Sequence, residues 1–114
     1  MSKKLEQVRR VLDQNNLPAG LITLITNVKW LTGFSGSYGV CVVTKNNFAF
    51  ISDSRYAEQA HEQVKDAEVF IFQSPKTAPE VLSEIVNEYE IPKMGFEADH
   101  VTVSGLKKWQ EKLQ

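Results

Sequence analysis

The sequence predicts an α/β domain in which helices flank a mixed central sheet. Segments with the apolar periodicity of helices alternate with short runs rich in β-branched and aromatic residues, as expected when helices cover a sheet. A tight strand pair in the middle of the chain requires antiparallel pairing, so the sheet is not purely parallel. No repeat or linker divides the 114 residues, which suffice for one hydrophobic core, and we expect one domain over residues 1–114.

The first element is an amphipathic helix that ends near residue 15. Its apolar face consists of Leu5, Val8, Val11 and Leu12. The sequence Asn-Asn-Leu-Pro at residues 15–18 stops the pattern. Residues 21–25 then form a nearly continuous apolar run, which is typical of a strand covered on both faces. The central sheet is therefore predicted to begin there.

A second extended piece is predicted at residues 30–32, before a glycine-rich loop at residues 33–39. The three glycines of the loop are spaced by three residues and allow backbone angles that other residues resist. Residues 40–44 and 48–51 are rich in β-branched and aromatic residues and are predicted to form a hairpin. The turn at residues 45–47 contains asparagines, which accept the positive φ angles of tight hairpin turns.

The middle of the chain predicts a helix followed by a strand. Asp53 or Ser54 can cap this helix. Its apolar face consists of Tyr56, Ala57, Ala60 and Val64, while its polar side carries residues such as His61. A strand is predicted at residues 68–72.

Another helix, a short strand and a final helix are predicted in the remaining sequence. Thr77 and Glu80 stand at capping-box spacing, with Pro79 in the first helical turn. The apolar stripe of this helix is Val81, Leu82, Ile85, Val86 and Tyr89. The short strand is predicted at residues 94–96. The last helix is predicted to be capped by Thr102 and buried through Leu106, Trp109 and Leu113.

The charge balance and the composition exclude several classes of function. Thirteen basic and fourteen acidic side chains leave a net charge of -1, so no overall field steers the protein onto nucleic acid or anionic lipid. The most apolar run, residues 21–25, is far shorter than the roughly 20 residues that a membrane-spanning helix needs. The start of the sequence lacks a secretory signal, and the single cysteine, Cys41, cannot form an internal disulfide. We therefore expect a soluble, cytoplasmic protein without nucleic-acid or membrane partners.

No catalytic motif is complete in this sequence. The glycines of the loop lack a following Gly-Lys-Ser/Thr, and neither Ser35 nor Ser37 stands in Gly-x-Ser-x-Gly. Residues 61 and 62 begin like a zinc-protease motif, but Lys65 occupies the position of its second histidine. Cys41 lies within an apolar strand, which favours a buried packing residue over a reactive thiol. We nominate no catalytic residue and no metal ligand.

Two segments carry a resemblance to a known family. Residues 27–39 read Asn-Val-Lys-Trp-Leu-Thr-Gly-Phe-Ser-Gly-Ser-Tyr-Gly, and residues 52–60 read Ser-Asp-Ser-Arg-Tyr-Ala-Glu-Gln-Ala. Together with the later Met-Gly-Phe-Glu at residues 94–97, they resemble the N-terminal domain of aminopeptidase P and prolidase. The resemblance covers essentially the whole chain. It implies the creatinase N-terminal-domain fold, a small mixed sheet with flanking helices and a ribonuclease H-like motif.

The resemblance also implies an activity for the full-length protein. Members of this family are Xaa-Pro metallopeptidases, which hydrolyse the bond before proline in short peptides. Their metal ligands, two aspartates, a histidine and two glutamates, lie in a second, "pita-bread" domain that binds two divalent ions, with manganese or cobalt expected here. None of these ligands matches a position in residues 1–114, so the catalytic domain is expected to be absent from this chain and the chain alone to be inactive.

In the family, the N-terminal domain supports oligomerisation and covers the active site of a neighbouring subunit. By this resemblance Phe34, Ser35, Ser37 and Tyr38 are expected to line the mouth of the partner subunit's pocket in a homodimer.

Trp30, Asp53 and Arg55 are expected to be structural or interface residues. A core position is favoured over an interface for Trp30. Asp53 and Arg55 either pair at the start of their helix or tie the domain to its catalytic neighbour.

Two other functions stay open at this point. Peptidase-like domains of this superfamily also serve as non-catalytic peptide- or protein-binding modules. Creatinase-like amidinohydrolases use the same two-domain plan without metals. The sequence of residues 31–37, Leu-Thr-Gly-Phe-Ser-Gly-Ser, resembles the peptidases more closely.

Overall fold

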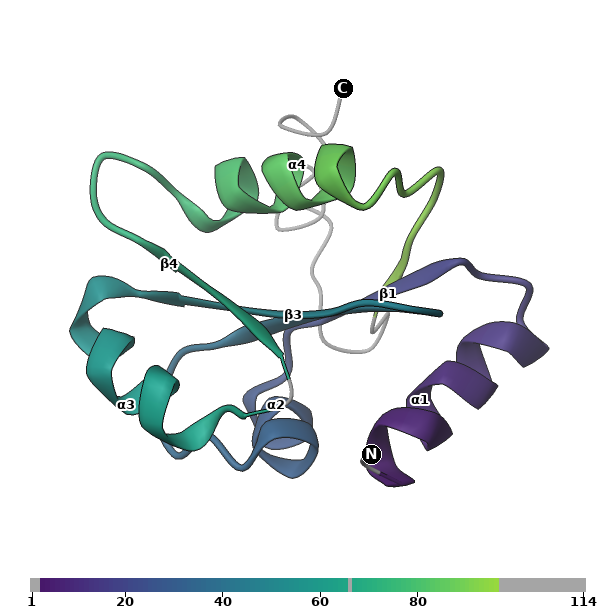
Figure 1. Ribbon diagram of the computed structural model, residues 1–114, viewed down its shortest axis with the longest axis horizontal. Coiled ribbons are helices and arrows are strands. Elements are labelled where there is room, and N and C mark those ends of the chain that lie inside the picture. Colours follow the sequence, from purple (N-terminus) through teal and green to yellow (C-terminus); the bar gives the residue numbers. More distant parts are fainter. Residues whose placement is uncertain (1–2, 66, 97–114) are drawn as a thin grey trace.

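A five-stranded sheet with the strand order β4-β3-β2-β1-β5 organises the protein. The computed structural model describes residues 3–65 and 67–96 (Figure 1). The strands are β1 (Ala19–Ile22), β2 (Val40–Thr44), β3 (Phe48–Asp53), β4 (Glu68–Phe72) and β5 (Gly95–Phe96). Strand β2 pairs antiparallel with β1 and β3, whereas β4 is parallel to β3 and β5 is parallel to β1. The predicted mixed α/β architecture is confirmed.

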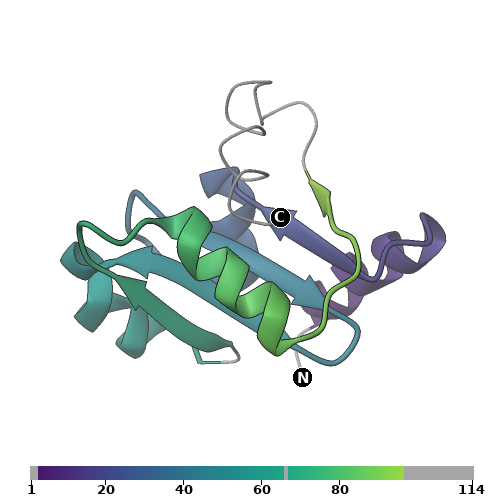
Figure 2. The same cartoon turned by 90° about the horizontal axis from the view of Figure 1, so that it is seen from above.

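Helices cover both faces of this sheet. Helices α1 (Lys3–Gln14), α2 (Ile25–Thr32) and α3 (Ala57–Gln63) lie on one face, and α4 (Ala78–Glu88) crosses the other (Figures 1 and 2). A short 3-10 helix, η1 (Ser54–Tyr56), leads from β3 into α3.

The alternation of side chains along the strands divides the core into two layers. Cys41, Val43 and Phe50 pack beneath the sheet with residues of α1, α2 and α3. Val42 and Ile51 pack above the sheet with residues of α4. Cys41 is fully buried, as predicted for a packing residue.

Most elements of the sequence-based prediction are present, and two were wrong in position or type. Strand β4 coincides with residues 68–72, and the helices near residues 3–14, 57–63 and 78–88 were also expected. The first strand begins and ends earlier than predicted. Residues 30–32, predicted to be extended, belong to helix α2.

Two details of capping and turn chemistry also differ from expectation. The non-glycine residues with positive φ in the described part are Asn16 and Glu90, so the asparagines of the β2–β3 turn do not use that conformation. Instead, the Thr44 hydroxyl accepts a hydrogen bond from the Asn47 amide at 2.8 Å. At the start of α4, the Thr77 hydroxyl bonds the Glu80 carboxylate at 3.2 Å, and Thr77 makes no side-chain bond to a backbone amide. The capping-box prediction was therefore wrong, although Thr77 is the N-cap.

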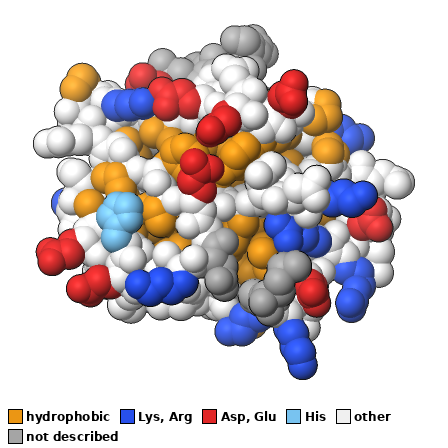
Figure 3. All heavy atoms as spheres, in the orientation of Figure 1, with side chains coloured by type: hydrophobic (Ala, Val, Ile, Leu, Met, Phe, Trp, Pro, Cys, Tyr) orange, Lys and Arg blue, Asp and Glu red, His pale blue; other side chains and the backbone are white. Residues whose placement is uncertain are grey.

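The predicted final helix, with Thr102, Leu106, Trp109 and Leu113, lies outside the described residues. Within residues 3–65 and 67–96, no helix is long and apolar enough to cross a membrane. Acidic and basic side chains are interspersed over the face of the molecule seen in Figure 3.

Candidate functional site

The glycine-rich loop, residues 33–39, lies at the end of the sheet where β2 begins and β1, β3 and β4 finish. The register pairs Val40 with Ile51 and Asp53 with Phe72, so the loop lies near the turn that follows β3. Ligands of open α/β sheets commonly bind beyond the carboxyl ends of the strands. The loop site consists of Ser35, Ser37 and Tyr38 with the residues that hold them, Tyr56, Gln59 and Gln63.

The loop starts at a helix cap and is anchored by a buried ring. Gly33 ends α2 in the left-handed conformation (φ 80°), which glycine adopts without steric cost, and its amide donates to the Lys29 carbonyl at 2.8 Å. The Phe34 side chain is fully buried, with ring centroids 4.8 Å from Phe50 and 5.8 Å from Tyr56. The first part of the loop is therefore fixed to the core.

The middle of the loop lies directly against these aromatic rings. A Cβ atom added at Gly36 would stand 2.3 Å from Cζ of Phe34 and 3.0 Å from Cδ1 of Tyr56. Real Cβ atoms do not approach other atoms as closely as the first of these distances. Glycine is required at this position because only its bare backbone fits over the rings.

Ser35 is held by two glutamines of α3. Its amide donates to Oε1 of Gln63 at 2.8 Å, and its hydroxyl accepts from Nε2 of Gln59 at 2.7 Å and from Nε2 of Gln63 at 3.0 Å. Ser37, the second exposed serine, hydrogen-bonds through its hydroxyl to the Tyr56 hydroxyl. Both serines are thus tied to η1 and α3.

Tyr38 lies between the loop and the sheet. Its ring meets Phe72 edge-on at a centroid distance of 6.1 Å, and its carbonyl accepts a hydrogen bond of 2.8 Å from the buried Ser52 hydroxyl. Burial, and next the negative charge of Asp53, raise the pKa of the Tyr38 phenol. A tyrosine phenol is already protonated at neutral pH, and this shift leaves it a hydrogen-bond donor.

Asp53 and Arg55 form a paired cap at the start of η1. The Asp53 carboxylate accepts from the Arg55 amide at 3.0 Å and binds its guanidinium through both oxygens, at 3.0 and 2.8 Å. The side-chain hydrogen bond to Arg55 is the main cause that lowers the pKa of Asp53. The guanidinium also lies 5.2 Å from the centroid of the Tyr56 ring. The pairing that we considered for these residues is present.

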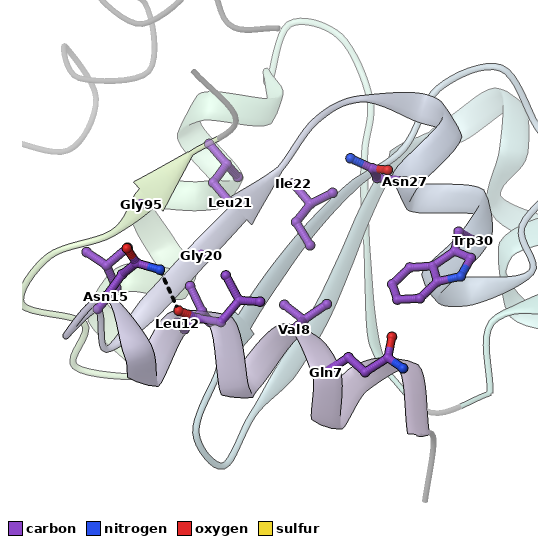
Figure 4. A pocket seen from close by; sticks show the side chains of 12 residues that line it. Gln7, Val8, Leu12, Asn15, Gly20, Leu21, Ile22, Asn27, Trp30 and Gly95 are labelled. Atoms are coloured by element: carbon purple, nitrogen blue, oxygen red, sulfur yellow. Dashed lines mark hydrogen bonds between the residues drawn. The ribbon is translucent and has the colours of Figure 1, made fainter. Parts of the chain in front are cut away.

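Trp30 lines a groove between α1 and α2 on the helix-rich face of the sheet (Figure 4). The groove has a volume of about 570 Å³, and its walls are mainly apolar. Gly20 and Ile22 of β1 contribute to its floor, and Val11 and Trp30, the two large exposed hydrophobic residues of the described part, contribute to its walls.

Two sequence-based expectations need correction. Trp30 is 42% exposed, so the core position that we favoured for it was wrong. Phe34 is fully buried and presents no side-chain surface to another subunit, which argues against its expected place in the lining of a pocket mouth. Ser35 and Ser37 are exposed, and Tyr38 is partly exposed.

Sequence reasoning missed the residues that hold the loop, namely Tyr56, Gln59 and Gln63. We assigned Tyr56 to the apolar face of its helix and did not single out the glutamines. The available signal was the spacing of four residues between the glutamines, which places both amides on one side of a helix.

The described part of the chain contains no candidate metal site. Among residues 3–65 and 67–96, no three histidine, cysteine, aspartate or glutamate side chains lie together as metal ligands would. His61 is exposed on α3, as predicted. The residues described here therefore do not fit the two-metal centre that the family implies.

The chain belongs to the creatinase/prolidase family: the family model for the Creatinase/Prolidase N-terminal domain matches residues 4–114. A curated relative, described as an uncharacterized peptidase of Bacillus subtilis, is 38% identical over 99 residues. That match covers 87% of this chain and 28% of the relative.

Solved structures agree with this membership. An Xaa-Pro dipeptidase from Bacillus anthracis superposes with a TM-score of 0.91 at 28% identity, covering 98% of this chain and 31% of the enzyme. The N-terminal domain of the cytoplasmic peptidase PepQ from Mycobacterium tuberculosis gives a TM-score of 0.88 at 31% identity, covering 99% of this chain and 86% of that domain. The chain thus spans less than a third of the Bacillus subtilis relative and of the Bacillus anthracis enzyme.

Proposed function

We propose that this chain is the non-catalytic N-terminal domain of an Xaa-Pro metallopeptidase of the aminopeptidase P or prolidase type. The observation that carries the proposal is the family match over residues 4–114, together with the fold shared with an Xaa-Pro dipeptidase. In the longer protein, a C-terminal domain binds two divalent ions, manganese or cobalt, and hydrolyses the bond before proline in short peptides. The full-length protein works in the cytoplasm.

The loop site covers the active site of a neighbouring subunit in a homodimer. Its position beyond the carboxyl ends of the strands supports this role, because a loop there projects from the sheet. Ser35, Ser37 and Tyr38 are the lining residues, and the buried Phe34 supports them from below. A covering loop excludes water and orients the substrate, which accelerates hydrolysis.

The groove with Trp30 receives the catalytic domain of the same polypeptide. Relatives of this chain continue for more than twice its length, so a large partner surface is available to them. An exposed tryptophan beside an apolar groove is a common feature of protein interfaces. The described residues that line the groove contribute amide and apolar side chains, which favours an apolar partner surface.

The proposal is tested by measuring peptide hydrolysis with added manganese or cobalt. We expect the full-length protein to hydrolyse an Xaa-Pro dipeptide or an Xaa-Pro-Yaa tripeptide, and the 114-residue chain to be inactive. The same peptides with alanine in place of proline serve as the control. Activity of the isolated chain, or inactivity of the full-length protein on all of these peptides, would contradict the proposal.

The role of the loop has its own test in the full-length protein. Tyr38→Ala removes a ring at the loop and is expected to lower kcat/KM on Xaa-Pro peptides by about tenfold or more, as the loss of one well-placed contact does. Tyr89→Ala, at the end of α4, is the matched control because Tyr89 is also a partly buried tyrosine. Equal activities of the two variants, both folded, would exclude a substrate role for the loop.

A further inference from the structure

We infer that Gln59 and Gln63 are positioning residues that hold the loop in the conformation needed to cover the peptide. This inference rests on the proposed function of the loop, and it adds two residues that the family resemblance did not assign. Neither glutamine is proposed to touch the substrate. They act through Ser35, which they bind from one side.

The two glutamines are arranged so that both of them bind Ser35. They lie one turn apart on α3, and both side chains are only partly exposed. Nε2 of Gln59 also lies 3.4 Å from Oε1 of Gln63, so the two amides are oriented relative to each other. Together they satisfy both the amide and the hydroxyl of Ser35, which is 28 residues away from Gln63 in the sequence. Such long-range side-chain bonds connect the loop directly to a helix.

The same contacts argue against a nucleophilic role for Ser35. A serine nucleophile needs an adjacent base that takes its proton. The groups around the Ser35 hydroxyl are the carboxamides of Gln59 and Gln63, which donate through nitrogen, accept from the hydroxyl through Oε1 of Gln63 at 3.3 Å and have no basic nitrogen. Ser35 is therefore a point of attachment, and its hydrogen bonds serve the shape of the loop.

A loop fixed in advance binds substrate better than a loop that must be ordered at the moment of binding. The core holds the loop at Phe34, and Tyr56 holds it at Ser37. Ser35 lies between these two points and is exposed, so its position depends on the glutamines. Loss of the glutamine contacts should loosen this part of the loop while the fold stays intact.

The first measurement is hydrogen exchange of the Ser35 amide in the 114-residue chain. We expect Gln63→Leu to accelerate this exchange by about tenfold, because the amide loses its acceptor. Gln63→Glu keeps an acceptor oxygen and should retain most of the protection. Gln14→Leu, at the exposed end of α1, is the control and should change nothing. Unchanged exchange in Gln63→Leu would overturn the inference.

The second measurement is the kinetics of the full-length protein on an Xaa-Pro peptide. We expect Gln59→Leu and Gln63→Leu to raise KM by roughly three- to tenfold, the size of one net hydrogen bond, with a smaller change in kcat. Gln63→Glu should restore KM toward the wild-type value. If Tyr38→Ala impairs hydrolysis but the glutamine variants do not, the positioning role is wrong and the proposed function stands. If none of these variants affects hydrolysis, the proposed role of the loop is wrong.

Discussion

At the scale of single residues, Phe34 joins the loop site to the hydrophobic core. Its ring packs on Phe50 beneath the sheet and meets Tyr56 edge-on. The backbone of Gly36 lies over the same ring. Because the ring is fully buried, it stabilises the fold and also supports the backbone to which Ser35 and Ser37 belong.

Truncation of this ring should therefore be costly. We expect Phe34→Ala to lower the free energy of unfolding by about 3–5 kcal/mol, the range for large buried aromatic residues that leave a cavity. Val11→Ala is the control, since Val11 is 56% exposed and its truncation should change stability by less than about 0.5 kcal/mol. Urea denaturation of the 114-residue chain measures both. Similar small losses in the two variants would mean that Phe34 does not fill the core.

At the scale of elements, α2 shows where sequence patterns were insufficient. Its sequence contains several β-branched residues, which have low helix propensity, and Leu24 at its N-cap offers no polar side chain. The helix is instead stabilised by tertiary packing of Val28 and Leu31 and by the left-handed C-cap at Gly33. Trp30 lies two residues, or about 200°, from Val28 on the helix and so faces outward. Because residues 30–32 were predicted to be extended, the outward orientation of Trp30 on a helix was not anticipated.

The other elements could be predicted because their local signals agree with the fold. The hairpin has β-branched strands and a short turn, and α4 has a regular apolar stripe with an early proline. The loop was recognised from its glycines, but its contacts were not, because Ser35 and Gln63 meet only through tertiary structure. The four-residue spacing of Gln59 and Gln63 places both amides on one side of a helix, but nothing in the sequence indicates that Ser35 is their partner.

The cap at the start of η1 supports a prediction at the same scale. Asp53→Ala removes the acceptor of the Arg55 amide and should lower the free energy of unfolding by about 1 kcal/mol at neutral pH. Arg55 lowers the pKa of Asp53 in the folded state, so this stabilisation is present above the ordinary aspartate pKa of about 3.9. This stabilisation is lost as the pH falls through the lowered pKa of Asp53 in the folded state.

The measurement is urea denaturation of both proteins at several pH values between neutral and strongly acidic. The difference between wild type and Asp53→Ala should be largest at neutral pH and should shrink below about pH 4. Asp53→Asn keeps a cap acceptor and lacks the charge. It therefore separates the contribution of the cap hydrogen bond to stability from that of the charge. A difference that stays constant through this pH range would show that the charge of Asp53 does not contribute.

At the scale of the whole molecule, the groove and the loop site occupy different places on the described part of the domain. The face with α1, α2 and α3 carries the groove and the exposed Trp30 (Figure 4). The loop site lies at the end of the sheet, and its contacts run to η1 and α3. Under the proposed function, the groove is the surface for attachment to the catalytic domain and the loop is the separate part that faces the substrate.

This division predicts that Trp30 becomes buried in the full-length protein. Labelling with 5-fluorotryptophan gives a fluorine resonance for each tryptophan. The signal that disappears in Trp30→Phe is the signal of Trp30.

In the 114-residue chain, a soluble paramagnetic agent should broaden the Trp30 signal, because the side chain is exposed. In the full-length protein the signal should be protected, since interface tryptophans are desolvated. The second tryptophan, Trp109, provides an internal comparison within each sample. Equal broadening of the Trp30 signal in both proteins would mean that the groove stays open to solvent and that the catalytic domain attaches elsewhere.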